Sequence, residues 1–202
     1  MDLMNLLQGH LTPEVINQLS QQTGTAPEQT ALAAQGIFSM LLSGLANNAS
    51  TENGATGILE ALDRDHDGSI LNDVMGLVMG SGQNSSATNG AGILGHILGG
   101  QQKDAAQMVS QTSGISLSGV MDMMIKLAPM VMGVIGQQKQ QQGGMNASGL
   151  AGLLGNTVQS QNENPLMQMA TRFLDKDGDG SAIDDVMGMV GSKFLGGMFG
   201  AK

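Results

Sequence analysis

The sequence predicts an all-α, multi-helical protein made of two tandem repeats of one helical unit, each with an Asp-rich helix-loop-helix. Apolar residues recur at spacings of three and four, without the sustained alternation of a β-strand. Stretches of the chain also match other stretches at fixed offsets, which is the mark of an internal repeat. The sequence Asp-x-Asp-x-Asp-Gly occurs twice, and each copy lies between predicted helices.

Local signals place the helices of the first copy. Thr12 followed by Pro13 is an N-cap with proline in the first turn, so it predicts a helix that ends at Gly24. Residues 25–28 then have the spacing of a capping box, which predicts a second helix running to about Asn47. A further helix leads to the first acidic loop.

The second copy repeats these signals. Gly114 is expected to close a helix, and Pro129 to kink the next one. Asn164 and Pro165 open another helix ahead of the second acidic loop. Each copy therefore contains a helix pair, a further helix, the acidic loop and a glycine-rich exit helix.

Two offsets define the repeat. A shift of 90 aligns residues 19–24 with 109–114, and a shift of 112 aligns 63–69 with 175–181, which indicates an insertion in the second copy. That insertion is rich in Gln, Gly, Asn and Ser, so we expect a flexible segment with one short helix around residues 150–154. The predicted organisation is a first repeat 1–80 with acidic loop 63–73, a polar linker 81–89, and a second repeat 90–202 with insertion 137–164 and acidic loop 175–185.

Composition limits the function classes. The chain has no Cys, which excludes disulfides, thiolate zinc sites and cysteine nucleophiles and fits a reducing cytoplasm. A net charge of −9 with eight scattered Lys and Arg argues against binding nucleic acid. The start lacks the pattern of a secretory signal, and apolar stretches such as 127–136 are shorter than the roughly 20 residues of a membrane span. We expect a cytoplasmic protein without a membrane span, with export by a signal-independent route left open.

Several motifs together resemble one protein family. They are ILGHILGG at 93–100, SGI at 113–115, LAPMVMG at 127–133 and HDGSIL at 66–71. In these motifs the chain resembles the bacterial YidB-like family, domain of unknown function 937. The resemblance covers most of the chain apart from the polar linkers. It implies a compact multi-helical fold and a bacterial origin, but it supplies no activity and no catalytic residues.

The two Asp-rich loops predict cation binding. A calcium ion takes six to eight oxygen ligands, and carboxylates at loop positions 1, 3 and 5, with glycine at position 6, form the first half of an EF-hand. The second half differs, because position 12 is Val74 or Val186 instead of glutamate, and the nearest acids are Asp73 and Asp185 at position 11. The expected ligands are Asp63, Asp65, Asp67, Ser69 and Asp73 in the first loop and Asp175, Asp177, Asp179, Ser181, Asp184 and Asp185 in the second.

A turn followed by a helix N-cap would also select Asp, Gly and Ser. Capping needs only one or two acids, however, and crowded carboxylates repel each other by roughly 4 kcal/mol per pair at 4 Å. We therefore expect two Ca²⁺ sites, with Mg²⁺ as the second candidate.

The other motifs of the sequence do not indicate an enzymatic activity. GAGILG at 90–95 matches a dinucleotide fingerprint but lacks the preceding strand, and His10, His66 and His96 lack the paired spacing of a zinc site. The methionines around 121–132 form either core or an adaptable groove. Glycine pairs such as Gly95 and Gly99 allow close helix contacts.

These observations predict a non-enzymatic calcium-binding helical protein that serves as a binding or self-assembling module. Association into a homo-oligomer would use the Gly- and Met-rich helices. The alternative is a purely structural helical protein whose Asp-rich loops are turns without metal, and an enzyme of unrecognised type ranks third.

Overall fold

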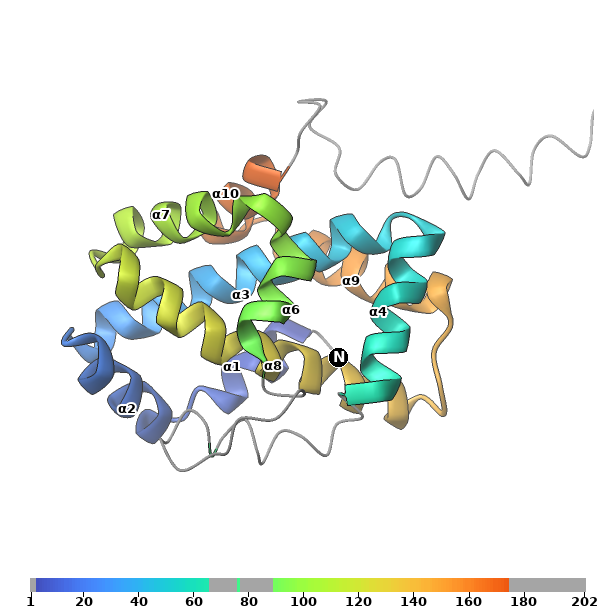
Figure 1. Ribbon diagram of the computed structural model, residues 1–202, viewed down its shortest axis with the longest axis horizontal. Helices are drawn as coiled ribbons and strands as arrows, with labels where there is room; N and C mark the ends of the chain where they lie inside the picture. The colour runs from blue at the N-terminus through green and yellow to red at the C-terminus, as the bar shows by residue number, and fades with distance from the viewer. Residues whose placement is uncertain (1–2, 66–75, 77–88, 175–202) are drawn as a thin grey trace, which may run out of the picture.

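Two long helices, α3 (Pro27–Ala49) and α8 (Leu117–Gln141), form the centre of the structure (Figure 1). The structure is a computed structural model, and it describes residues 3–65, 76 and 89–174. The other helices are α1 (Leu3–His10), α2 (Pro13–Thr23), α4 (Glu52–Asp65), α6 (Gly90–Leu98), α7 (Gln102–Ser113), α9 (Ala147–Ser160) and α10 (Pro165–Leu174), with a 3-10 turn at Gly99–Gln101. The described residues contain no strand, so the all-α prediction is confirmed there.

The expected helix ends are confirmed where a local cap defines them. Thr12 caps α2 through its side chain, which accepts a hydrogen bond from the Val15 N–H at 3.4 Å. Gly24 and Gly114 follow α2 and α7 in the left-handed region, with φ of 66° and 75°. Only glycine adopts this conformation without steric cost, which is why it ends a helix.

The start of α3 differs by one residue from the predicted capping box. The N-cap is Ala26, which has no side-chain acceptor, and the Gln29 side chain accepts a hydrogen bond from the Ala26 N–H at 3.3 Å. The hydroxyl of Thr25 instead pairs with that of Thr30 at 3.0 Å. The helix itself runs two residues beyond the expected end.

The insertion is more ordered than its composition indicates. Its first residues, 137–141, are the last turns of α8, and Gly143 and Gly144 then turn the chain with φ of 72° and 114°. The short helix expected at 150–154 is the 14-residue α9, which packs against α3 and α4. Leu150, Leu154 and Val158 of α9 are buried, so this segment is part of the core instead of a flexible linker.

Glycine brings helices close together, but at other positions than the predicted Gly95 and Gly99 pair. A Cβ added at Gly90 would lie 1.6 Å from the Ile125 carbonyl oxygen of α8, and one at Gly44 would lie 2.8 Å from Ile97 Cγ2. A Cβ added at Gly95 would lie 3.5 Å from its nearest neighbour, Gln102 Nε2, and one added at Gly99 would have no atom within 4 Å. The close contacts therefore join α6 to α8 and to α3.

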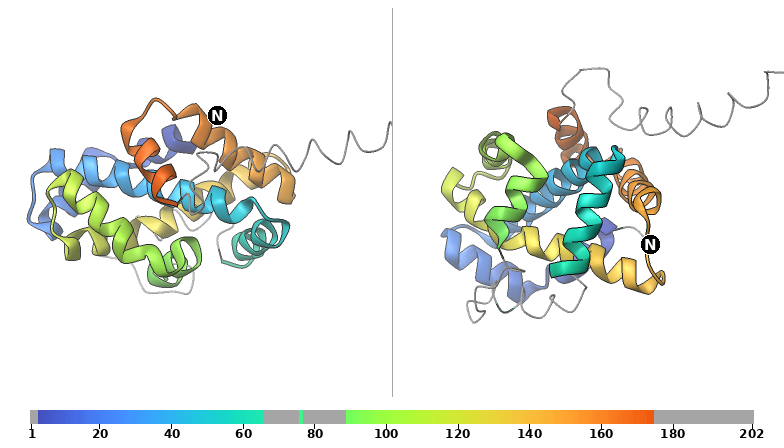
Figure 2. Two further views of the ribbon diagram at one scale, coloured as in Figure 1. Left: turned by 90° about the horizontal axis from the view of Figure 1, so that it is seen from above. Right: turned by 45° about the vertical axis from the view of Figure 1, so that its right-hand side comes forward.

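The helices of the two predicted repeats share one core. Helix α3 packs against α7, α9 and α10 of the second repeat, and α8 packs against α1, α2 and α4 of the first (Figures 1 and 2). The α2/α3 and α7/α8 pairs follow the offset of 90, since α2 ends at Thr23 and α7 at Ser113, while α3 begins at Pro27 and α8 at Leu117. The repeat itself stays a prediction.

Helix α8 is long and apolar enough to cross a bilayer by length and composition, and it is the one such helix among the described residues. Its most apolar 18-residue window is 78% buried by the other helices, as in the central helix of a folded domain. Met123, Met124, Met130 and Met132 lie in this buried part, so they serve as core.

Candidate functional site

The first acidic loop begins at the end of α4, and the core fixes the position of this helix. Ala55, Ile58 and Leu62 recur at spacings of three and four, and all three are buried. Asp63 follows Leu62 in sequence, so it lies about 100° around the helix from that buried residue, and 71% of its side chain is exposed. Asp65 is the last residue of α4.

Asp63 forms an ion pair with Lys139, which no sequence motif indicated as part of the site. Its carboxylate Oδ1 accepts a hydrogen bond from Lys139 Nζ, near the end of α8. The lysine side chain is only 14% exposed, so it packs along the protein surface with its ammonium group at Asp63. Lysine at this position gives the first expected ligand of the loop a cationic partner.

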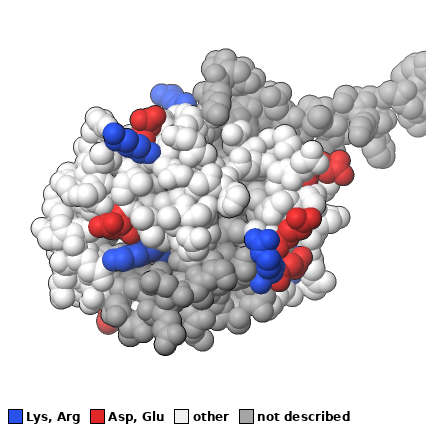
Figure 3. Space-filling model, viewed as in Figure 1, with Lys and Arg blue, Asp and Glu red and all other residues white. Residues whose placement is uncertain are grey.

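An open hollow of about 400 Å³ lies beside this ion pair. Its walls are Leu62 and Asp63 of α4, Gly136, Lys139 and Gln140 of α8, and the Gly143–Gly144 turn. The hollow is mainly apolar, and Asp63 and Lys139 are the charged residues that line it. Charged groups are also few and scattered on the face of the molecule seen in Figure 3.

The second acidic loop follows α10, which is held on α3. Asn164 caps α10, because its side-chain oxygen accepts a hydrogen bond from the Leu166 N–H at 3.0 Å. Met167, Ala170 and Leu174 are the buried residues of α10, and Ser43 of α3 donates a hydrogen bond to Met167 Sδ at 3.3 Å. The described part of the chain ends at Leu174, the residue before Asp175.

The remaining predicted ligands lie outside the described residues. They are Asp67, Ser69, Asp73, Asp175, Asp177, Asp179, Ser181, Asp184 and Asp185. Within residues 3–65 and 89–174, no three His, Asp or Glu side chains are grouped closely enough to hold a metal ion. The structure thus locates the helices that lead to both loops, together with Asp63 and the backbone of Asp65.

The described residues form a multi-helical all-α domain in which two long central helices are enclosed by shorter ones. The chain belongs to the bacterial protein family of unknown function DUF937, whose family model matches residues 5–138. The match runs from α1 into the last turns of α8, so it includes the first acidic loop and stops before the second. Comparison with curated proteins and with solved structures gave no match.

Proposed function

We propose that this chain is a non-enzymatic calcium-binding protein in which each Asp-rich loop holds one cation at the end of a core-anchored helix. Cation binding would order the loop and the apolar segment after it for packing against a neighbouring surface. The observation that carries the proposal is the duplication of Asp-x-Asp-x-Asp-Gly: the first copy begins in the last turn of α4 and the second directly follows α10, and both helices pack on the central helices.

The location of Asp63 supports the first site. A calcium loop takes its first ligand at the end of the incoming helix, and Asp63 is in the last turn of α4 with an exposed carboxylate. Because α4 is anchored through Leu62, a ligand at position 63 is held in place before any cation arrives.

Two findings favour the alternative, in which the loops are turns without metal. Lys139 already neutralises Asp63, and the chain has no glutamate at position 12 of either loop. Both features lower the expected affinity. They leave unexplained why the chain repeats three closely spaced carboxylates, which repel one another without a counter-charge.

Calorimetric titration tests the proposal directly. The protein is treated with a chelator, dialysed and titrated with CaCl₂, and then with MgCl₂ as the comparison. We expect two calcium sites per chain, with weaker binding of magnesium because its octahedral geometry suits this many-toothed ligand set poorly. No heat of binding with either ion up to millimolar concentration would favour the structural alternative.

Thermal unfolding gives a second test. A ligand that binds only the native state at one hundred times its Kd adds about 2.7 kcal/mol per site, enough to raise the Tm by several degrees. The double variant Asp65→Asn/Asp177→Asn should lose most of this shift. Without metal it should melt no lower than the parent, because a repulsion is relieved. Equal Tm values with calcium and with chelator in the parent would refute the proposal.

A further inference from the structure

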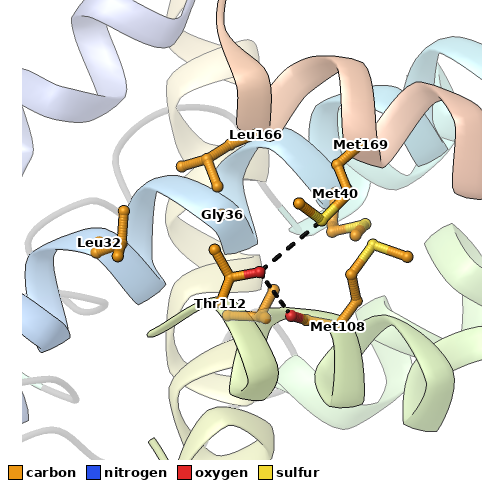
Figure 4. Close-up of a pocket in the computed structure, with 8 residues that line it drawn as sticks. Leu32, Gly36, Met40, Met108, Thr112, Leu166 and Met169 are labelled. Atoms are coloured by element: carbon orange, nitrogen blue, oxygen red, sulfur yellow. Dashed lines mark hydrogen bonds between the residues drawn. The ribbon is translucent and has the colours of Figure 1, made fainter. Parts of the chain in front are cut away.

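A shallow apolar groove lies between α3, α7 and α10 (Figure 4). Helix α3 supplies one wall, α7 the second and α10 the third. The residues that matter here are Leu32, Gly36, Met108, Thr112, Leu166 and Met169. Gly36 lets α3 and α7 pack closely, because a Cβ there would lie 3.4 Å from Val109 Cγ2.

The groove exposes apolar surface and no unpaired polar group. Leu32 is 38% exposed, which makes it the most exposed large hydrophobic side chain among the described residues. Met108, Leu166 and Met169 are half-buried around it. The Thr112 hydroxyl is satisfied within the groove, since it donates to the Met108 carbonyl oxygen at 2.9 Å and contacts Met169 Sδ at 3.8 Å. Such a surface suits apolar side chains, and methionine adapts to their shape.

The corresponding surface in the other half of the molecule is polar. With the offset of 90 that relates α3 to α8, Leu32 corresponds to Asp122 and Gly36 to Lys126. Lys126 donates a hydrogen bond to the Gln22 side chain of α2, and Gln22 corresponds to Thr112. The contact between α2 and α8 therefore carries polar side chains at the surface. The corresponding contact between α3 and α7 does not need an apolar surface to form, so the apolar groove needs another explanation.

The chain itself contains a matching apolar stripe after α10. Residues Ile183, Val186, Val190, Phe194 and Met198 follow one another at spacings of three and four, as on one face of a helix. The stripe is tethered to the groove, because α10 forms one wall and the segment follows α10 in the sequence. Eight residues, 175–182, span up to about 26–29 Å when extended, whereas Met169 lies about 7.5 Å along α10 from Leu174.

We propose that residues 183–199 of the same chain form an amphipathic helix that docks in this groove, with Leu32, Met108 and Met169 receiving its apolar face. This is helix-in-groove recognition, with anchors at three and four spacing. The short tether favours the segment of the same chain over one from a second copy, because it keeps the local concentration high. The proposal does not depend on calcium binding, so its tests are run in chelator.

The absence of cysteine from the chain makes cross-linking a clean test. The double variant Leu32→Cys/Phe194→Cys should form a disulfide within one chain under mild oxidation, at least about tenfold faster than Glu60→Cys/Phe194→Cys. The control keeps the same thiol in the C-terminal segment and moves the other to an exposed position on α4, which does not line the groove. Equal rates, or disulfides formed only between chains, would overturn the proposal.

A second test leaves the C-terminal segment unchanged. Leu32→Glu places a charge in the groove at an exposed position, so the helical content by circular dichroism should match the parent. Trypsin should then cut after Lys193 about tenfold faster in this variant than in the parent or in Leu32→Met. If Leu32→Glu folds and Lys193 is cut at the parent's rate, the segment does not occupy the groove.

Discussion

Thr12 and Glu14 stabilise the start of α2 through local polar contacts. The Thr12 side chain accepts a hydrogen bond from the Val15 N–H, and Glu14 lies in the first turn, where the helix dipole favours a negative charge. A hydrogen bond from its own backbone N–H, and then one from the Thr12 hydroxyl, hold the pKa of Glu14 below its ordinary value.

This lowered pKa gives a pH-dependent prediction. A carboxyl whose pKa is lower in the folded state contributes stability above its unfolded pKa and loses it as the pH falls through the folded pKa. Glu14→Gln should therefore lower the urea midpoint at pH 7, and the difference should shrink as the pH falls through the lowered pKa of Glu14. Thr12→Ala, which removes the cap, should cost about 1 kcal/mol at pH 7. A deficit in Glu14→Gln that persists unchanged in acid would contradict this account.

If the proposed site binds a cation, that cation and Lys139 would compete for the Asp63 carboxylate, which yields a second prediction for single residues. An exposed ion pair is worth about 0.2–1 kcal/mol, so removing the lysine should tighten calcium binding at the first site by up to about fivefold. The variant is Lys139→Met, and titration calorimetry measures its effect. Lys126→Met is the matched control, because Lys126 is also on α8 but donates to Gln22. An equal effect of both variants would mean that only the net charge matters.

At the scale of the elements, the contact between α6 and α8 depends on the absence of a side chain at Gly90. Gly90→Ala should destabilise the protein by about 1–3 kcal/mol or more, because the added Cβ would overlap the Ile125 carbonyl. Gly57→Ala in α4 is the control: nothing lies within 4 Å of its added Cβ, so it should be neutral or stabilising by up to about 1 kcal/mol. Denaturant unfolding of both variants checks this, and a neutral Gly90→Ala would disprove the close packing.

Helix ends were predictable from the sequence where the signal is local. Thr12, Gly24, Gly114 and Asn164 each mark an end that the structure contains, because a cap depends on a few neighbouring residues. Helix α9 and the last turns of α8 were not fully predictable. Their Gln- and Gly-rich sequence is a weak helix signal, and burial of Leu150 and Leu154 in the core outweighs it.

The sequence indicated the acids of the candidate site, whose role as ligands stays a prediction, but it did not indicate the cationic partner of Asp63. The structure places Asp63 in the last turn of α4 with an exposed side chain, whereas the loop pattern makes it the first residue of a loop. Lys139 is 76 residues away in sequence, and no local pattern connects the two. Their contact arises only because α8 passes beside α4 in the folded chain.

At the scale of the whole molecule, the shared core predicts that the first half cannot fold alone. Helix α3 packs against α7, α9 and α10, so a fragment of residues 1–89 would leave much of its buried surface in water. We expect this fragment to show little stable helix by circular dichroism, and the full chain to unfold in one cooperative step. A fragment with native-like helicity and its own cooperative melting transition would show that the halves are independent.

The way α3 is enclosed also has a consequence for protein synthesis. Ala49 ends α3, and the last described helix that covers it, α10, ends at Leu174, 125 residues later. Ribosomes add about 5–20 residues per second, so the apolar face of α3 under α10 waits about 6–25 s for this partner. A nascent chain of this design therefore stays exposed to chaperones and to self-association until α10 has been synthesised.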